Sequence, residues 1–158
     1  SKWVGEEMCM LYSKLYDLNT SIARFFNVYG PRHVESGPYA TVVAIFEKQY
    51  GLGIPLTVTG TGEQRRDFTH VYDICNGLIA ISEGNYKGEV FNLGTGNNFS
   101  IKELAQMFEG SKIEYTDKRP GEANETLADI SLTKEKTGWE PMRDIRNYIK
   151  SFLKEGAA

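Results

Sequence analysis

Two glycine-rich stretches are the first candidates for a site that binds phosphate. Residues 60–62 and residues 94–96 both read Gly-Thr-Gly. A dinucleotide-binding fingerprint needs a further glycine three positions after the second one, because the following helix packs closely against the strand there. Arg65 and Phe99 occupy that position in the two stretches. The sequence therefore has no complete dinucleotide phosphate loop, and tight turns are the simpler interpretation of both stretches.

Arginines in loops are the second candidates. Arg65 and Arg66 follow the first glycine turn, and Arg119 lies three residues before Glu122 in another loop. A guanidinium group can donate two charge-assisted hydrogen bonds to a diphosphate at once. The alternative is that these arginines are solvated or paired with a neighbouring carboxylate such as Asp67 or Glu122, as loop arginines commonly are. The residue types alone leave both interpretations open.

Other kinds of site find little support in the sequence. His33 and His70 have no metal-ligand spacing to each other or to a cysteine, so we expect no metal site. A Gly-x-Ser-x-Gly nucleophile motif does not occur in the sequence. Cys9 and Cys75 lie in apolar-periodic segments without a Cys-x-x-Cys spacing, which predicts reduced core residues of a cytoplasmic protein and no disulfide.

Composition narrows the class of partner. The 158 residues carry a net charge of -3, which disfavours a nucleic-acid partner because such partners need a concentrated basic face. The longest apolar runs, such as residues 41–46, are far shorter than the roughly 20 residues that span a bilayer. Apolar residues make up 41% of the chain, enough for a core. We therefore expect a soluble globular protein that binds neither nucleic acid nor membrane.

Periodic patterns predict the elements that must position these residues. Apolar residues at three- and four-residue spacing predict helices over 2–17, 39–50, 73–82 and 145–153. Short apolar runs predict strands at 21–29, 55–59, 68–71, 89–93 and 113–115, with a loop over 32–38.

Two further helices are predicted from their ends. Ser100 and Glu103 form a capping-box pattern that starts a helix running to about residue 108. Ser131 is predicted to cap a short helix that ends at Gly138. Strands thus alternate with helices along the chain, and this order predicts an α/β fold with some parallel pairing.

Five longer motifs carry a resemblance to a known family. They are Arg-Phe-Phe-Asn-Val-Tyr-Gly-Pro-Arg at 24–32, Gly-Thr-Gly-Glu-Gln-Arg-Arg-Asp-Phe at 60–68 followed by His-Val at 70–71 and Asp at 73, Phe-Asn-Leu-Gly-Thr-Gly at 91–96, Arg-Pro-Gly-Glu at 119–122 followed by Ala-Asp at 128–129, and Gly-Trp-Glu-Pro at 138–141. In this order and spacing they resemble the extended short-chain dehydrogenase/reductase family. Within it, the chain is most similar to NAD-dependent nucleotide-sugar epimerases of the UDP-glucose 4-epimerase type. The motifs do not determine the sugar.

The resemblance implies that the chain is a carboxy-terminal portion. Ser1 and Lys2 match the end of the family's Tyr-x-x-Ser-Lys helix, while the tyrosine, the glycine fingerprint and the first Rossmann strands have no counterpart. We therefore expect the last parallel strands of a Rossmann domain plus a small α/β substrate-binding part. Residues 1–30 and about 73–108 would complete the Rossmann part, and about 31–72 and 109–158 would mostly bind substrate.

The same resemblance implies roles in cofactor binding and catalysis. Lys2 would be the catalytic lysine and would bind the nicotinamide ribose of NAD, and Phe26 would lie near the nicotinamide. In the family mechanism a tyrosinate removes a sugar hydroxyl proton while hydride passes to NAD, and the lysine lowers the tyrosine pKa through its charge. The keto sugar then receives the hydride on its other face. Since the tyrosine and the fingerprint have no counterpart here, we expect the isolated chain to be inactive.

Substrate-binding roles follow in the same way. Asn27 would bind a phosphate of the nucleotide-sugar, Arg66 and Arg119 would clamp its diphosphate, and Glu122 would accept hydrogen bonds from the ribose hydroxyls. Four further positions would contact the phosphate and base largely through the backbone: Thr41, Val42, Thr57 and Val58. A UDP-sugar is the expected ligand.

The sequence leaves two alternative functions open, and it indicates one protein partner. The parent enzyme could be a nucleotide-sugar 4,6-dehydratase, or the chain could be a binding module without redox chemistry. The expected partner is a second copy of the chain. The first helix carries an apolar stripe that includes Val4, Met8, Leu11 and Leu15, and in this family the corresponding helix commonly lies at a dimer interface.

Overall fold

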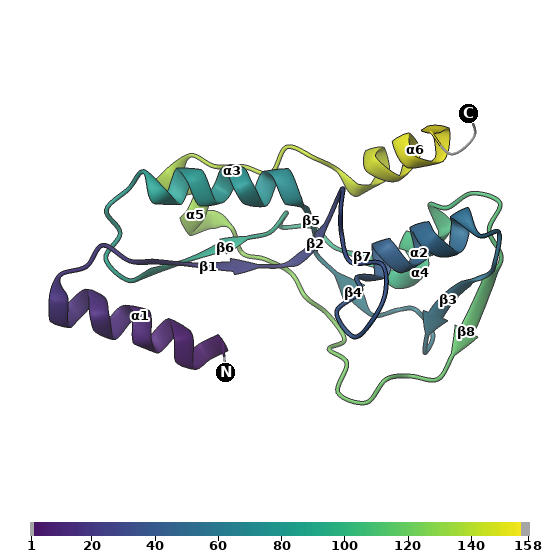
Figure 1. Cartoon of the computed structure of the whole chain (residues 1–158), viewed down its shortest axis with the longest axis horizontal. Coiled ribbons are helices and arrows are strands. Elements are labelled where there is room, and N and C mark those ends of the chain that lie inside the picture. The colour runs from purple at the N-terminus through teal and green to yellow at the C-terminus, as the bar shows by residue number, and fades with distance from the viewer. Residues whose placement is uncertain (1, 156–158) are drawn as a thin grey trace.

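The computed structural model describes residues 2–155 as an elongated α/β molecule. Figure 1 shows two halves joined near β2 and β5. One half contains α1 (Lys2–Tyr16), β1 (Ser21–Phe25), α3 (Val71–Ser82), β6 (Glu89–Leu93) and α5 (Ser131–Thr137). The other contains α2 (Val42–Gly51), β3 (Leu56–Thr59), β4 (Arg65–Arg66), β7 (Phe99–Ser100), α4 (Ile101–Gln106), β8 (Ile113–Thr116) and α6 (Ile145–Glu155). The predicted α/β class is confirmed.

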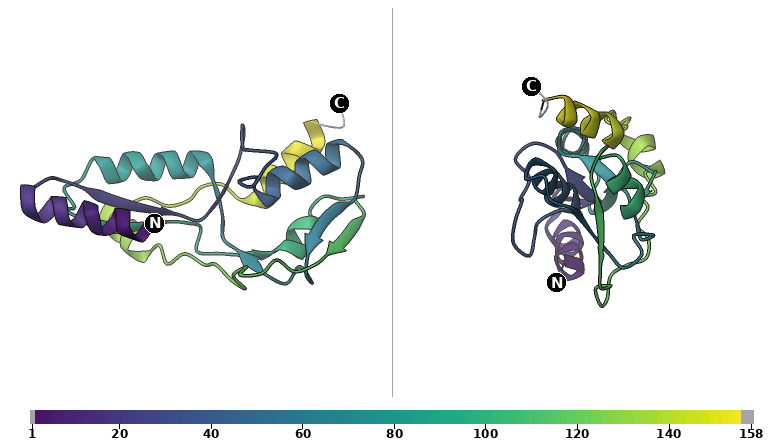
Figure 2. Two further views of the ribbon diagram at one scale, coloured as in Figure 1. Left: turned by 60° about the horizontal axis from the view of Figure 1, so that its bottom comes forward. Right: turned by 90° about the vertical axis from the view of Figure 1, so that its right-hand side faces the viewer.

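The first half is built on the parallel pair of β1 and β6, in register from Ser21 opposite Glu89 to Phe25 opposite Leu93. Figure 1 shows α3 above this pair and α1 below it. A small core fills the space under α3: Ile74, Ile81, Phe91, Leu93 and Trp139. Helix α1 contributes little to any core, because Ser13 is its one buried residue. Figure 2 shows α1 at the end of the molecule opposite α2 and α6.

The strand predicted over residues 21–29 is wrong in one respect, because the chain forms two strands there. β1 ends at Phe25, and β2 (Asn27–Tyr29) pairs in parallel with β5 (Phe68–His70). The exchange of partners occurs at Phe26, whose amide donates to the Leu93 carbonyl at 3.3 Å, while the next amide, of Asn27, donates to the Asp67 carbonyl at 2.9 Å. One apolar run therefore serves both halves of the molecule.

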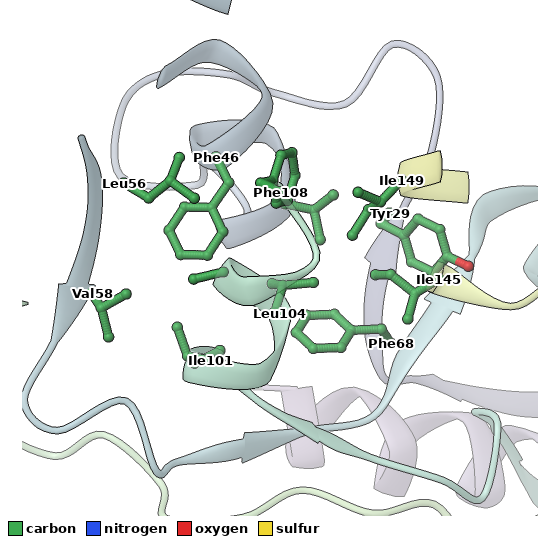
Figure 3. Packing of buried hydrophobic residues seen from close by; sticks show 12 residues of the cluster. Tyr29, Phe46, Leu56, Val58, Phe68, Ile101, Leu104, Phe108, Ile145 and Ile149 are labelled. Atoms are coloured by element: carbon green, nitrogen blue, oxygen red, sulfur yellow. The ribbon is translucent and has the colours of Figure 1, made fainter. Parts of the chain in front are cut away.

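The second half has the larger core, formed around α4. Figure 3 shows Leu104 of α4 in the middle of this cluster, with Phe46 of α2 and Phe68 of β5 near it. The cluster consists of Tyr29, Val43, Phe46, Leu56, Val58, Phe68, Ile101, Leu104, Ala105, Phe108, Ile145 and Ile149. On its outer side, β3 pairs in parallel with β8. The side chain of Gln49 ties α2 to β3 by bonding the amide and the hydroxyl of Thr57.

Helix ends agree with the sequence at two places and differ at a third. The capping box of Ser100 and Glu103 is confirmed, and Gly138 ends α5 with φ of 69° as predicted. Ser131 is not the cap of α5, because Ile130 holds that position without a side-chain bond. The carboxylate of Asp129 instead accepts a hydrogen bond from the Ser131 amide at 3.0 Å. The side chain that accepts a hydrogen bond at the start of α5 is thus that of Asp129, two residues before the predicted Ser131.

Burial corrects the prediction for the cysteines. Cys9 and Cys75 are both free and both exposed, so they are not core residues. Each lies on the outer face of an amphipathic helix, where helical spacing alone does not identify which face is covered.

The predicted division of the chain into a Rossmann part and a substrate-binding part stays a prediction. Ile101 and Leu104 of α4 belong to the larger core, whereas Trp139, which follows α5, belongs to the smaller one.

Among residues 2–155, no helix is long and apolar enough to cross a membrane. The same residues include no group of three histidine, cysteine or acidic side chains placed to hold a metal ion.

Candidate functional site

A cavity of about 560 Å³ opens in the second half of the molecule. Its walls come from β2, the start of α2, β3, β4, β5, the start of α4, β8 and the loop after β8. The structure brings seven of the predicted site residues together in its lining: Asn27, Thr41, Val42, Thr57, Arg66, Arg119 and Glu122. These residues are spread over most of the chain, so the cavity exists only in the folded state.

Arg66 and Glu122 contact each other in this cavity. Nη2 of Arg66 lies 3.1 Å from Oε1 of Glu122, and the two side chains are 12% and 21% exposed. Nη1 of Arg66 also donates to the Arg65 carbonyl at 2.8 Å. The other carboxylate oxygen of Glu122 accepts a bond of 3.4 Å from the Thr59 hydroxyl. A guanidinium carries five N–H donors, so Arg66 keeps donors for a ligand while it holds Glu122.

Arg119 differs from Arg66 because it has no partner within residues 2–155. It is exposed on the loop after β8, and its guanidinium makes no hydrogen bond or ion pair with the described part of the chain. A cation that lines a cavity without a partner is available to an anionic ligand. Arg119 and Arg66 therefore supply two positive charges to the cavity, and Glu122 supplies one negative charge.

Arg65 does not line the cavity and instead makes structural hydrogen bonds to Asn98. Its guanidinium donates to the Asn98 side chain at 2.7 Å and to the Asn98 carbonyl at 2.8 Å, and it lies 3.1 Å from Glu103. The Ser100 amide, and secondarily the charge of Arg65, lower the pKa of the Glu103 carboxyl. Neighbouring residues of a strand point to opposite faces, so only one of the two adjacent arginines, Arg66, reaches the cavity.

Asp67 is a residue whose importance the sequence reasoning missed. Its fully buried carboxylate accepts hydrogen bonds from the amides of Thr95, Gly96 and Ala128 at 2.8, 3.0 and 3.1 Å. The second Gly-Thr-Gly stretch is thus a docking turn for this carboxylate. A Cβ at Gly94 would lie 2.2 Å from that of Ala128, which excludes a side chain there. The spacing of these motifs gave no sign that they touch.

Thr41 and Thr57 of the predicted site also make structural hydrogen bonds, and Val58 packs in the core. The Thr41 hydroxyl caps α2 by accepting from the Ala44 amide at 3.3 Å. The Thr57 hydroxyl accepts from Gln49 at 2.8 Å. Val58 lies in the core with no exposure and does not line the cavity, so only its backbone is left for a ligand. Thr57 and Val58 separate in this way because side chains alternate along β3.

Lys2 and Phe26 are not among the residues that line this cavity. Lys2 lines a separate groove of about 590 Å³ between α1 and β1. In that groove Arg24 pairs with Glu6, with bonds of 2.9 and 2.5 Å. Phe26 is half-buried next to Gly94, where the two halves of the molecule meet. Ser1, the other predicted motif residue at this end, lies outside the described residues.

Comparison with known proteins decides the family. Residues 1–94 match the sequence profile of the NAD dependent epimerase/dehydratase family. The chain belongs to this family. The resemblance inferred from the five motifs is therefore confirmed, and NAD is the cofactor of the family.

Relatives and solved structures of the epimerase/dehydratase family extend this result. A Methanocaldococcus jannaschii relative, named as a candidate UDP-glucose 4-epimerase, is 36% identical over 95% of this chain and 50% of its own length. UDP-glucuronic acid decarboxylase 4 of Arabidopsis thaliana is 34% identical over 98% of this chain and 35% of its own length. The crystal structure of Thermotoga maritima UDP-glucose 4-epimerase with UDP-glucose superposes with a TM-score of 0.90 at 29% identity, over 99% of this chain and 53% of that one. The chain thus spans about half the length of such relatives or less, and its fold is that of the matching part of a Rossmann-type epimerase.

The cofactor can be tested against the residues present. The 158 residues contain no complete glycine fingerprint; Lys2 lines the groove between α1 and β1, and Phe26 lies next to Gly94. The residues of this chain therefore do not make a complete NAD site by themselves. The residues that line the cavity of Arg66 and Arg119 by contrast include seven of the predicted substrate-binding residues.

Proposed function

We propose that this chain is the substrate-binding part of an NAD-dependent nucleotide-sugar epimerase that acts on a UDP-sugar. One observation carries the proposal: two arginines and a glutamate from separate segments converge on one cavity, with Arg119 free to bind an anion. Its volume of about 560 Å³ suits a ligand of nucleotide size, because small-molecule cavities typically measure about 300–1,000 Å³. The family and the UDP-sugar names of its relatives support the choice of ligand class.

We propose for these residues the roles that the family resemblance implies, and the place of seven of them in the cavity lining supports these roles. Arg119 and Arg66 would bind the diphosphate, and Asn27, half-buried on β2, would bind one of its phosphates. Glu122 would accept from the ribose through the oxygen that now faces Thr59. Backbone groups of Thr41, Val42, Thr57 and Val58 would contact the rest of the nucleotide.

We also propose that catalysis needs more than these 158 residues. Lys2 stands at the start of α1 and would be the catalytic lysine of the full-length protein. It has no tyrosine partner at the family spacing in this sequence, and no fingerprint loop is present to bind the cofactor phosphates. The isolated chain should therefore bind a UDP-sugar without converting it.

Self-association is a further part of the proposal. The exposed apolar side chains of α1 are Trp3, Val4, Met8, Leu11, Tyr12, Leu15 and Tyr16. A continuous apolar stripe of this kind marks an interaction surface in soluble proteins, and a second copy of α1 offers a matching stripe. Two exposed free thiols, Cys9 and Cys75, favour a reducing compartment, so we propose a cytoplasmic location.

A second candidate is sugar-nucleotide decarboxylation. The 34% identity to a UDP-glucuronic acid decarboxylase over 98% of this chain favours it nearly as much as the comparison with the epimerases. Both reactions use a UDP-sugar, so the cavity alone does not separate them. Incubation of the full-length protein with UDP-glucose and with UDP-glucuronic acid, followed by analysis of the sugar products, decides between inversion and loss of carbon dioxide.

Calorimetric titration of the chain with UDP and UDP-glucose tests the proposed function. We expect both ligands to bind at one site per chain. An Arg119→Ala variant should bind both more weakly. No binding of UDP to the folded chain would contradict the proposal.

A further inference from the structure

The loop over residues 31–40 forms part of the cavity wall, and little in the loop itself holds its path. Val28 lines the cavity before the loop, Ala40 lines it at the end of the loop, and Thr41 lines it directly after the loop. Most of the loop is exposed, with Val34 at 55% and Tyr39 at 86%. Its internal backbone bond joins the Ala40 amide to the Gly37 carbonyl at 3.2 Å.

His33 is the exception in this loop, because its side chain is only 11% exposed. Nε2 of His33 lies 2.9 Å from Oε2 of Glu47 on α2, whose side chain is 12% exposed. Tyr148 of α6 lies beside the same carboxylate. Burial raises the pKa of Glu47, and the charge of His33 opposes that rise. The pair thus joins the first part of the loop to α2, next to α6.

The hydrogen bonding around the pair suggests that the pair contributes little to the stability of the fold. Nδ1 of His33 and Oε1 of Glu47 are buried without a hydrogen bond of ordinary geometry among residues 2–155, although Tyr148 lies beside the carboxylate. Buried polar atoms without partners destabilise a fold, and a buried ion pair is often no better than apolar side chains of similar size. Such a pair is more readily explained by the geometry that it imposes.

We propose that the His33–Glu47 pair is a positioning device that holds the cavity wall in its binding geometry. Thr41 caps α2 and lines the cavity, while Glu47 lies further along the same helix. The bond of His33 to Glu47 fixes where the first part of the loop passes α2, and this limits the paths by which the chain reaches Ala40 and Thr41. Without His33, the loop samples other paths, and ordering them on ligand binding costs affinity. This inference rests on the proposed function.

The test compares UDP binding by the chain in four forms. His33→Ala should weaken UDP binding about three- to tenfold, and His33→Gln, which keeps an N–H donor for Glu47, should recover most of it. Val34→Ala is the matched control, because it shortens an exposed side chain in the same loop, and it should leave the affinity unchanged. Without ligand, hydrogen exchange at the amides of Ala40 and Thr41 should be faster in His33→Ala than in the unaltered chain.

Each outcome of this test bears on the inference. If the unaltered chain binds UDP and His33→Ala binds it equally well with unchanged exchange in the loop, the inference is wrong and the proposed function stands. If the unaltered chain does not bind UDP, both are wrong. If His33→Ala fails to fold by circular dichroism, His33→Gln and Glu47→Gln provide the comparison. Faster exchange confined to the loop in a folded Glu47→Ala variant supports the inference, and exchange at the rate of the unaltered chain overturns it.

Discussion

Arg66 and Glu122 form an ion pair inside the cavity, with 3.1 Å between Nη2 and Oε1, although 56 residues separate them in the chain. The sequence suggested either a ligand contact or a neighbouring carboxylate for each loop arginine. The structure shows the carboxylate pairing for Arg66, and because Arg66 also lines the cavity, a ligand contact is still possible for it and stays a proposal. Arg119 lines the same cavity without a partner in residues 2–155.

Removal of either cavity arginine should weaken nucleotide-sugar binding. A charge-assisted hydrogen bond contributes about 1.5–3 kcal/mol, so Arg66→Ala and Arg119→Ala should each raise the Kd for UDP-glucose roughly ten- to a hundredfold. Lysine at either position should restore only part of the affinity, because it cannot make a two-pronged contact. Calorimetry on the chain measures both effects.

Lys118→Ala is the control for these variants. It removes one positive charge next to Arg119, yet Lys118 does not line this cavity. Its effect on UDP-glucose affinity should be small. Equal affinities for the control and both arginine variants would refute the diphosphate clamp. In the full-length protein the arginine variants should also leave the affinity for NAD unchanged.

The 158-residue chain should not bind NAD. Cofactor phosphates are held by a glycine turn at the start of a helix, and neither Gly-Thr-Gly stretch completes that turn. Titration with NAD should give no heat of binding under conditions where UDP-glucose does. Micromolar NAD binding at one site per chain would show that this expectation is wrong.

The first helix should drive self-association. Leu11 and Leu15 on α1 are 50% and 63% exposed. A Leu11→Glu, Leu15→Glu double variant places charge in the apolar stripe, so it should remain monomeric at concentrations where the unaltered chain associates. Light scattering over a concentration series measures this. Leu52→Glu is a matched control, because Leu52 is 64% exposed and follows α2 at the opposite end of the molecule. A monomeric unaltered chain at high concentration would argue against the interface.

His70 should make stability fall in acid. Burial, aided by Arg143, lowers the pKa of His70 below its ordinary value of 6.5, although Asp73 opposes this. The unfolded chain therefore binds a proton that the folded chain refuses, and stability that is present above the ordinary pKa is lost as the pH falls through the lowered one. His70→Asn removes the titration and can still cap α3, where His70 Nδ1 accepts from the Tyr72 amide.

Urea unfolding of both forms from about pH 7.5 to about pH 5 checks this prediction. The unfolding free energy of the unaltered chain should decrease relative to that of His70→Asn as the pH falls. The comparison cancels the other titrating groups, including Glu47, whose raised pKa acts in the opposite direction. Parallel pH profiles would mean that His70 titrates alike in both states.

Asp67 should be essential for the fold near the cavity. Asp67→Asn leaves one acceptor oxygen where two serve three backbone amides, and its new amide group faces donors. Each buried donor left without a partner costs about 1–3 kcal/mol, so the variant should lose roughly 2–4 kcal/mol of unfolding free energy. Asp117→Asn, at an exposed position, is the control. A loss below about 0.5 kcal/mol would contradict this account of the carboxylate.

The elements of the fold could be predicted from the sequence because they depend on local contacts. The capping box of Ser100 and Glu103 joins residues three apart, and the glycine end of α5 needs only the freedom of Gly138 to adopt a positive φ. The exceptions are equally informative. The break at Phe26 and the short β4–β7 pair depend on strands distant in sequence, so no local pattern reveals them.

Local patterns and motifs in the sequence predicted most of the helices and strands, the family and the residue types available for an anionic ligand. Which of these residues meet depends on long-range contacts of the folded chain. Asp67 reaches the Ala128 amide across 61 residues, and Arg66 reaches Glu122 across 56. Long-range contacts also place Arg65 against Asn98, whereas the adjacent Arg66 lines the cavity. Periodicity reflects neighbours within one or two turns of chain, whereas a site is formed by contacts whose loop-closure cost is met only when the whole core assembles.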